Sequence, residues 1–168
     1  MAQRHDNYMW VREKQDHDLE WIRADRFDDK TLPRPLVVVN GAFDLLHAGH
    51  MRLIFHAREL AHNGTLICAM DSDRRIRESK GPSRPILTWV ERATLLTYMP
   101  LDYLIEIDSD MEMKKFLHRV KPDTRVQGGE YLSTASKYPR IKKAFVRSDG
   151  IHTSTIIERI AAQCKNQN

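Results

Sequence analysis

The stretch LVVVNGAFDLLHAGHMRL, residues 36–53, joins an apolar run to an amphipathic pattern through two glycines and two histidines. The run LVVV predicts a buried strand, and the residues around Gly49 predict the start of a helix. Gly41 lets the chain turn with its backbone close to a ligand, and Gly49 removes a side chain from the first helical turn. A helix start presents unpaired backbone N–H groups and a positive dipole end, which together favour a phosphate. The stretch therefore predicts an anion site at the end of a strand.

Two histidines frame this helix start. His47 and His50 are three residues apart and project from neighbouring positions on one helix face. Imidazoles beside an anion site can donate hydrogen bonds to charge that develops on a phosphoryl group. A zinc site would need further ligands, and no cysteine or histidine cluster lies nearby in the sequence. The pattern favours phosphoryl chemistry over metal binding.

Strand and helix patterns alternate along the rest of the chain. Apolar runs such as TLICAM and YLIEI alternate with helical patterns such as ILTWVERATLLTYM, for which Thr88 is the predicted N-cap. Strands without polar alternation are typical of sheets covered on both faces. The chain is predicted to be an α/β protein with a Rossmann-like, doubly wound parallel sheet of about five strands and helices on both faces. Ligands bind at the carboxyl ends of such strands, where NGAFD stands.

The composition limits the class of protein. The chain has 168 residues, enough for one domain with a core that needs no disulfides. Its 27 basic and 23 acidic residues leave a net charge of +4, a surplus that suits a phosphorylated small molecule, a nucleic acid or no partner at all. Cys68 and Cys164 show neither metal-ligand spacing nor the pattern of a secreted scaffold, and no apolar run approaches the roughly 20 residues of a membrane span. We expect a cytoplasmic protein.

The chain divides into two parts. Residues 1–34 are dense in alternating charges with scattered aromatics and end in Pro33 and Pro35. We interpret them as an N-terminal arm, helical and packed on the domain or on a second subunit, because a disordered tail usually carries fewer aromatics. Residues 35–168 form the predicted catalytic domain.

Several motifs of the domain resemble one family. NGAFDLLHAGH resembles the HxGH signature of the nucleotidyltransferase superfamily, in the GxFDxxHxGH form of its cytidylyltransferase-like branch. DSDRRIRESKGPSRPI and KPDTRVQGGEY are similar to the KGxxRPI and KPDxxVKGGDY elements of bacterial D-glycero-β-D-manno-heptose 1-phosphate adenylyltransferase domains. RSDGIHTSTIIERI is similar to the terminal EGxSTTxII element of the wider family. The resemblance covers Leu36 to about Ile160.

The resemblance implies a reaction. A phosphate of the acceptor, a sugar or polyol phosphate, attacks the α-phosphate of a nucleoside triphosphate in line, and pyrophosphate leaves without a covalent enzyme intermediate. His47, His50 and Lys80 are the implied catalytic residues. Mg²⁺ is the expected cofactor, as a bridge between phosphate oxygens, because it needs few protein ligands. A homodimer is also implied, and membrane binding is not.

The resemblance also implies a binding site for the nucleotide. Its residues are Gly41, Ala42, Phe43, Gly49, Arg84, Gly128, Arg147, Thr153 and Ser154. Thr153 and Ser154 begin a predicted helix whose hydroxyls and N–H groups can hold the β and γ phosphates. Asp44 is expected either to support the structure or to lie near the acceptor. For Arg84 and Arg92, a charge on the surface of a helix or loop is as compatible with the sequence as a role in binding phosphate.

Departures from the motifs leave alternatives open. His152 stands where the family usually has a small hydroxyl residue, and Gln127 replaces the lysine of VKGGDY. KGPSRPI and GGEY favour ATP, whereas RSDGI is closer to glycerol 3-phosphate cytidylyltransferases that use CTP. Met99 and Pro100, in turn, replace an Arg-Tyr pair of those enzymes. The alternative of another class is a non-catalytic module that binds nucleotides or nucleic acid through the basic surplus.

Overall fold

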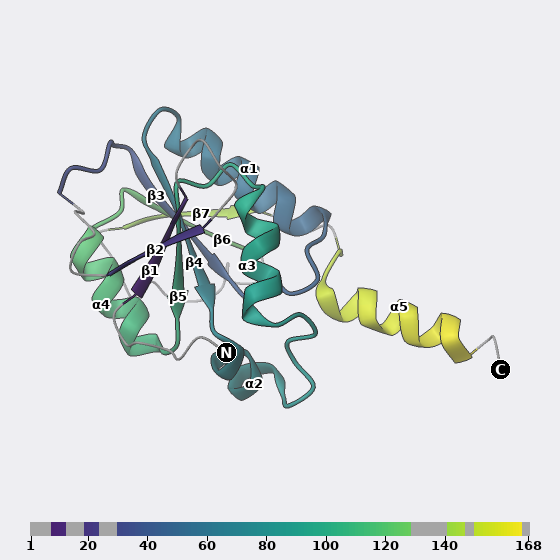
Figure 1. The fold of residues 1–168 in the computed structure, drawn as a ribbon. Helices are drawn as coiled ribbons and strands as arrows, with labels where there is room; N and C mark the ends of the chain where they lie inside the picture. Colours follow the sequence, from purple (N-terminus) through teal and green to yellow (C-terminus); the bar gives the residue numbers. More distant parts are fainter. Residues whose placement is uncertain (1–7, 13–18, 24–29, 129–140, 147–149, 166–168) are drawn as a thin grey trace.

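The computed structural model describes residues 8–12, 19–23, 30–128, 141–146 and 150–165, and the side chains from residue 30 onward. Over these ranges the chain forms one seven-stranded sheet with helices packed on it (Figure 1). The strands are β1 (Tyr8–Arg12), β2 (Leu19–Arg23), β3 (Leu36–Gly41), β4 (Thr65–Asp71), β5 (Tyr103–Ile107), β6 (Thr124–Gly128) and β7 (Lys142–Val146). The helices are α1 (Ala48–Ala61), α2 (Asp73–Lys80), α3 (Trp89–Thr97), α4 (Asp110–Val120) and α5 (Thr153–Lys165).

The central part of the sheet is parallel and doubly wound. Its strand order is β5-β4-β3-β6-β7, and each neighbouring pair is parallel. The chain runs outward from β3 through β4 to β5 and then crosses back to β6 and β7. The order therefore reverses beside β3, and ligands bind in the crevice at such a point. The predicted five-stranded parallel sheet is confirmed, and the motif that follows β3 lies at its crevice.

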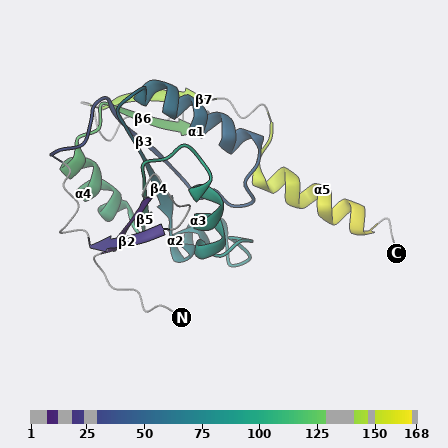
Figure 2. The same cartoon turned by 45° about the horizontal axis from the view of Figure 1, so that its top comes forward.

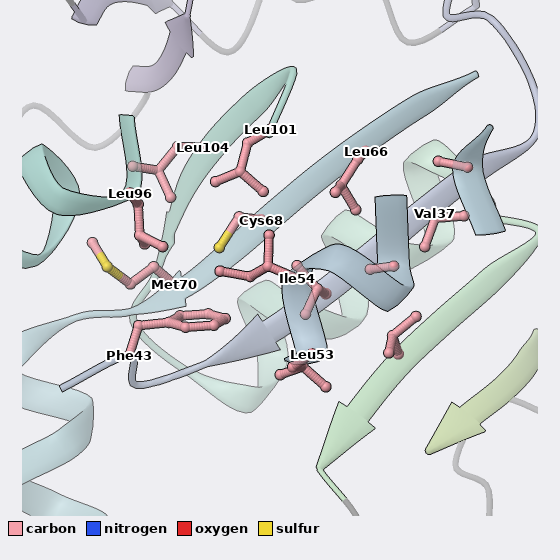
Figure 3. Close-up of a cluster of buried hydrophobic side chains, with 14 of the residues drawn as sticks. Val37, Phe43, Leu53, Ile54, Leu66, Cys68, Met70, Leu96, Leu101 and Leu104 are labelled. Carbon is pink, nitrogen blue, oxygen red and sulfur yellow. The ribbon is translucent and has the colours of Figure 1, made fainter. Parts of the chain in front are cut away.

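Both faces of the sheet are covered. Val37 and Val39 of β3 belong to a hydrophobic cluster with α1 and α3, which is drawn with Ile54 at its centre in Figure 3. Leu36 and Val38 belong to a second cluster, with α4, on the opposite face. All four strand residues are fully buried, which explains why LVVV shows no polar alternation.

The predicted start of α3 is confirmed. The Glu91 N–H donates to Thr88 Oγ1 at 3.4 Å, and the Thr88 N–H donates to the Glu91 carboxylate at 2.7 Å. This capping box satisfies two backbone donors that the first turn leaves open. The capping box lies where the loop between α2 and α3 ends, so it fixes that end of the loop beside the crevice.

The prediction that the N-terminal arm is helical is wrong for its described residues, which form the strands β1 and β2. β1 and β2 pair antiparallel over their whole length, and β1 pairs antiparallel with β5 through Trp10 with Leu104 and Val11 with Tyr103. The segments YMWVR and LEWIR are rich in aromatic and branched residues, which favour a strand once a sheet edge is available for pairing. The scattered charges of the arm obscured this preference in the sequence.

The last helix leaves the body of the protein. Figures 1 and 2 show α5 extending away from the sheet. Thr153 at its start is buried, whereas residues 158–165 are exposed. Among the described residues no helix is both long enough and apolar enough to cross a membrane.

Candidate active site

A cleft of about 420 Å³ opens at the carboxyl end of β3. Its lining comes from segments far apart in the sequence: Asn40, Gly41, Ala42, Phe43, His47, Gly49, His50, Leu53, Lys80, Arg84, Gly128, Val146, Ile151, His152, Thr153 and Ser154. The predicted site residues that the structure describes all belong to this lining, with the exception of Asp44. Arg147, also predicted, lies outside the described residues. The fold thus brings the first, middle and last motifs to one cleft.

The two motif histidines form a stacked pair. Their ring centroids are 3.8 Å apart, and the ring planes are inclined by 27°. His47 is the N-cap of α1, and its Nδ1 accepts a hydrogen bond from the Gly49 N–H at 3.1 Å. Because Nδ1 is the acceptor, the neutral ring of His47 carries its proton on Nε2. On the other side of the pair, the Phe43 ring lies 5.3 Å from the His50 ring.

Both rings are neutral at pH 7. Burial, together with repulsion from a protonated His47 and from Lys80, lowers the pKa of His50 to about 3. Burial and the charge of His152 also lower the pKa of His47. Neutral imidazoles act through their N–H groups as hydrogen-bond donors and do not add positive charge. His50 Nδ1 is buried and has no hydrogen-bond partner among the described residues.

Among the described residues, the positive charge of the cleft comes from Lys80 and Arg84. Lys80 ends α2 with an exposed side chain, and its charge reaches His50. Arg84 follows in the loop, and its side chain is only 12% exposed. Its Nε donates to Asp44 at 2.7 Å, while its Nη2 is buried without a hydrogen-bond partner in the described part of the chain. The guanidinium is therefore oriented, with donors left for an anion, and it is not a surface charge.

Asp44 binds other residues of the site through its buried carboxylate. Its side chain is fully buried, and its carboxylate accepts hydrogen bonds from Arg84 and from the N–H groups of Ile86 and Leu87. Burial alone would raise the pKa of Asp44, but these hydrogen bonds and the Arg84 charge outweigh burial and lower it. The carboxylate is occupied by protein donors, which favours the structural alternative over a contact with the acceptor.

The start of α5 packs on the same residue. Thr153 Oγ1 donates to the Asp44 carbonyl at 2.7 Å, and the exposed Ser154 lies beside it at the cleft. A Cβ atom at Gly49 would lie 3.1 Å from the Ile151 carbonyl oxygen and 3.0 Å from the His47 ring. Gly49 therefore lets α1 and the segment before α5 approach closely, as the sequence predicted for the first turn of the helix.

Arg92 is a structural residue that the sequence did not identify. It is fully buried on α3, which corrects the alternative of a surface charge. Its guanidinium donates to the carbonyl oxygens of Ala42, Asp71 and Leu87 and, at 2.7 Å, to the Asp73 carboxylate. One cation thus connects the loop after β3, the end of β4 and the loop before α3.

The cleft also contains residues that were not predicted to be part of it. They are Asn40, Leu53, Val146, Ile151 and His152. Asn40 Oδ1 accepts a hydrogen bond from Arg125 Nε at 2.8 Å, so its amide is oriented by β6. Its position directly before Gly41 at the end of a predicted strand was a signal that could have marked it.

Comparison with known proteins agrees with this geometry. Residues 38–165 match the family described as Cytidylyltransferase-like. The protein named Bifunctional protein HldE from Syntrophotalea carbinolica is 35% identical over 135 residues, which cover 76% of this chain and 27% of that protein. Bifunctional protein HldE from Helicobacter pylori strain Shi470 is 33% identical, with 78% of this chain and 28% of that protein covered. The chain thus spans less than a third of the length of these curated relatives.

A solved structure is similar as well. The lipopolysaccharide core biosynthesis protein from Thermoplasma volcanium GSS1 superposes with a TM-score of 0.52 at 25% sequence identity, covering 67% of this chain and 93% of that chain. The match over residues 38–165 and the identity with the HldE proteins make this chain a member of the cytidylyltransferase-like family.

Proposed function

We propose that this chain transfers a nucleoside monophosphate from a nucleoside triphosphate to a sugar or polyol phosphate and releases pyrophosphate. The observation that carries the proposal is the stacked pair of neutral imidazoles at the start of α1, in the same cleft as Lys80, Arg84 and the start of α5. Donors and cations from three segments converge on one place, which suits an anion with several phosphates.

The chemistry follows from the charges involved. An oxygen of the acceptor phosphate forms a bond to the α-phosphorus while the bond to the pyrophosphate oxygen breaks, and both reactants are anions. Alignment and charge stabilisation are therefore the main tasks of the protein. The N–H groups of His47 and His50 donate to the oxygens of the α-phosphoryl group. Lys80 neutralises the negative charge that builds up on the departing pyrophosphate. Arg84, held by Asp44, orients the phosphate chain.

Magnesium is part of this proposal. No carboxylate of the described residues lines the cleft, and no group of three or more potential ligands among them is arranged to hold a metal ion. Such a cleft fits an ion that arrives on the nucleotide and is held by phosphate oxygens, as Mg²⁺ commonly is. When bound, Mg²⁺ would neutralise part of the phosphate charge.

The nucleotide is proposed to be ATP, supported by the KGPSRPI and GGEY stretches. CTP is the alternative, supported by RSDGI. The resemblance of KGPSRPI and GGEY to heptose 1-phosphate adenylyltransferase domains supports a sugar phosphate as the acceptor, as does the identity of 33–35% with the relatives named Bifunctional protein HldE. A cytoplasmic location is proposed because nucleoside triphosphates are made and used there.

The test is magnesium-dependent release of pyrophosphate. ATP and CTP are supplied separately, each with heptose 1-phosphate, glycerol 3-phosphate or other sugar and polyol phosphates. Release with one pair would identify the reaction, the base and the acceptor together. Nucleotide binding without release from any pair would contradict the proposal and would favour a non-catalytic binding module.

A homodimer is also proposed. An apolar groove of about 570 Å³, lined by residues at and just before the start of α1 and by residues near and just after the end of α3, lies beside the cleft and shares His47 with it. Leu95 and Tyr98 in its lining are 41% and 61% exposed, and exposed apolar patches often mark contact surfaces. Leu95→Lys should lower the mass seen by sedimentation equilibrium, whereas Val90→Lys, on the same helix but outside the groove, should not. An unchanged mass for Leu95→Lys would contradict this interface.

A further inference from the structure

A buried amide beside the cleft has an oxygen atom without a partner. Gln127 is only 7% exposed, and its Oε1 atom is buried with no hydrogen-bond partner among the described residues. A buried acceptor that stays unpaired costs free energy, so native proteins keep few of them. Gln127 stands in place of the lysine of the resembled VKGGDY motif, and a lysine side chain has no acceptor atom. This chain therefore has an acceptor that its described fold does not use.

The sheet places Gln127 next to residues of the cleft. Gln127 directly precedes Gly128, which ends β6 and lines the cleft. Because Val39 pairs with Val126, Asn40 and Gln127 follow at the same level on the neighbouring strands β3 and β6. Asn40 also lines the cleft. The unpaired amide thus lies between two residues that a ligand in the cleft can reach.

The amides of Asn40 and Gln127 belong to one face of the sheet. Arg125 Nε donates to Asn40 Oδ1 at 2.8 Å, so these two side chains lie on the same face. Gln127 is two residues after Arg125 and points to that face as well, since side chains alternate along a strand. Leu36 and Val38 pack with α4 on this face, whereas α1 covers the other. The amide pair therefore faces away from α1.

This part of the cleft suits an uncharged ligand group. An amide is neutral and carries both donors and an acceptor, and a hydroxyl group has the same two capacities. In an in-line reaction the attacking acceptor and the departing pyrophosphate lie on opposite sides of the α-phosphorus. The donors for the phosphates of the nucleotide are at the starts of α1 and α5, so the amide face is left for the acceptor.

We propose that Gln127 Oε1 accepts a hydrogen bond from a hydroxyl group of the acceptor and thereby selects for a polyhydroxylated sugar or polyol phosphate. This inference rests on the proposed function of the cleft. Gln127 is then a specificity-determining residue: its unpaired oxygen destabilises the free protein, and pairing with the hydroxyl stabilises the complex.

The test compares two phosphate probes. Heptose 1-phosphate carries hydroxyl groups, whereas propyl phosphate has none on its carbon chain, so the ratio of their dissociation constants reports the recognition of hydroxyl groups. Gln127→Met removes the acceptor atom at a similar side-chain volume, and Gln127→Glu keeps an acceptor at the same place. Gln163→Met, the same change at an exposed position of α5, is the matched control. Calorimetry measures the binding of both probes, ATP and CTP, and urea unfolding without ligand measures stability.

The wild type should prefer heptose 1-phosphate, and Gln127→Met should reduce this preference roughly tenfold, the size expected for one hydrogen bond. Gln127→Glu should keep most of the preference, although its charge weakens the binding of both phosphates. Affinity for ATP and CTP should stay the same in Gln127→Met. Without ligand, Gln127→Met should unfold at a higher urea concentration than the wild type, because it lacks the unpaired acceptor. Gln163→Met should match the wild type in both measurements.

An unchanged preference in Gln127→Met would overturn the inference, and so would an equal loss in Gln163→Met or a wild type without any preference. Unfolding of Gln127→Met at a lower urea concentration would show that the fold itself needs the amide. Weaker binding of ATP or CTP with an unchanged preference would assign the oxygen to the nucleotide instead.

The two proposals fail separately. A preference that depends on Gln127, without pyrophosphate release from any substrate pair, would contradict the proposed function and leave the hydroxyl contact standing. Pyrophosphate release with a preference that does not depend on Gln127 would do the reverse.

Discussion

At the scale of single residues, the site combines neutral donors at the start of α1 with cations from other segments of the chain. His47 and His50 are neutral because burial lowers the pKa of both, and they stack at 3.8 Å without charge repulsion. Two imidazolium ions at that separation would repel each other. The positive charge is supplied by Lys80 and Arg84, whose side chains come from α2 and the loop after it.

His50→Ala should lower kcat by roughly 100-fold or more, because it removes a donor that is needed when charge develops on the phosphoryl group. The fold should remain, since the ring lies at the cleft. Pyrophosphate release measures the effect, and thermal unfolding followed by circular dichroism checks the fold. His118→Ala is the control on α4. Turnover near the wild-type level would contradict the assigned role of His50.

The same residue makes stability depend on pH. The pKa of His50 falls from 6.5 to about 3 on folding, so below about pH 6.5 the unfolded chain binds a proton that the folded chain does not. Folding is therefore weakened progressively as the pH falls from 6.5 toward 3. Urea unfolding at pH 7.5 and pH 5 should show a larger loss of stability in the wild type than in His50→Ala. Equal losses in the two proteins would refute this linkage.

The contiguous motifs predicted most of the described residues of the cleft, because each motif is local in sequence. Arg92 was missed for the opposite reason. Its partners include Ala42 and Asp71, which lie 50 and 21 residues away, and no local pattern reports such distances. Asp44 stood within a motif, but only the structure shows that its carboxylate is occupied by Ile86, Leu87 and Arg84.

At the scale of elements, the parallel strands and their helices followed their sequence patterns. Burial on both faces removed polar residues from β3 and β4, and amphipathic spacing marked α1, α3 and α4. The arm did not follow its pattern, because the strand preference of β1 and β2 is realised only by pairing with β5. A short stretch of sequence does not show that a distant segment supplies a sheet edge for it to pair with.

Arg92→Met should destabilise the fold by about 3 kcal/mol, since it leaves three partly buried carbonyl groups and the Asp73 carboxylate without their donor. Urea unfolding measures the change. Arg77→Met, on the exposed face of α2, is the matched control and should change stability by less than about 1 kcal/mol. Similar stabilities for the two variants would show that the buried guanidinium does not connect these elements.

At the scale of the whole molecule, the arm and the cleft lie on different parts of the sheet. The strand order places β4 between β5, where the arm is attached, and β3, where the cleft opens. The arm covers the backbone edge of β5 over the paired residues, and an uncovered edge can pair with another chain. The arm therefore protects the edge of β5 and makes β2 the outer strand of the sheet, and the described lining of the cleft contains no residue of the arm.

Deletion of residues 1–29 should increase self-association while dilute protein keeps most of its turnover. Sedimentation velocity over a range of concentrations measures association, and pyrophosphate release at low concentration measures activity. The full-length chain at equal concentrations is the control. A truncated chain that sediments like the full chain at every concentration would argue against protection of the β5 edge.

Asp44 connects the cleft to segments that are far along the chain. Arg84, bonded to its carboxylate, is 40 residues away, and Thr153, bonded to its carbonyl, is 109 residues away. Contacts of such long range form only after large loops have closed, and they depend on the last helix being present. During synthesis on the ribosome, a chain that has not yet emerged as far as α5 lacks one wall of its cleft. The cleft therefore acquires its α5 wall, with Thr153 and Ser154, only after synthesis has passed this helix, long after its β3 and α1 walls have been made.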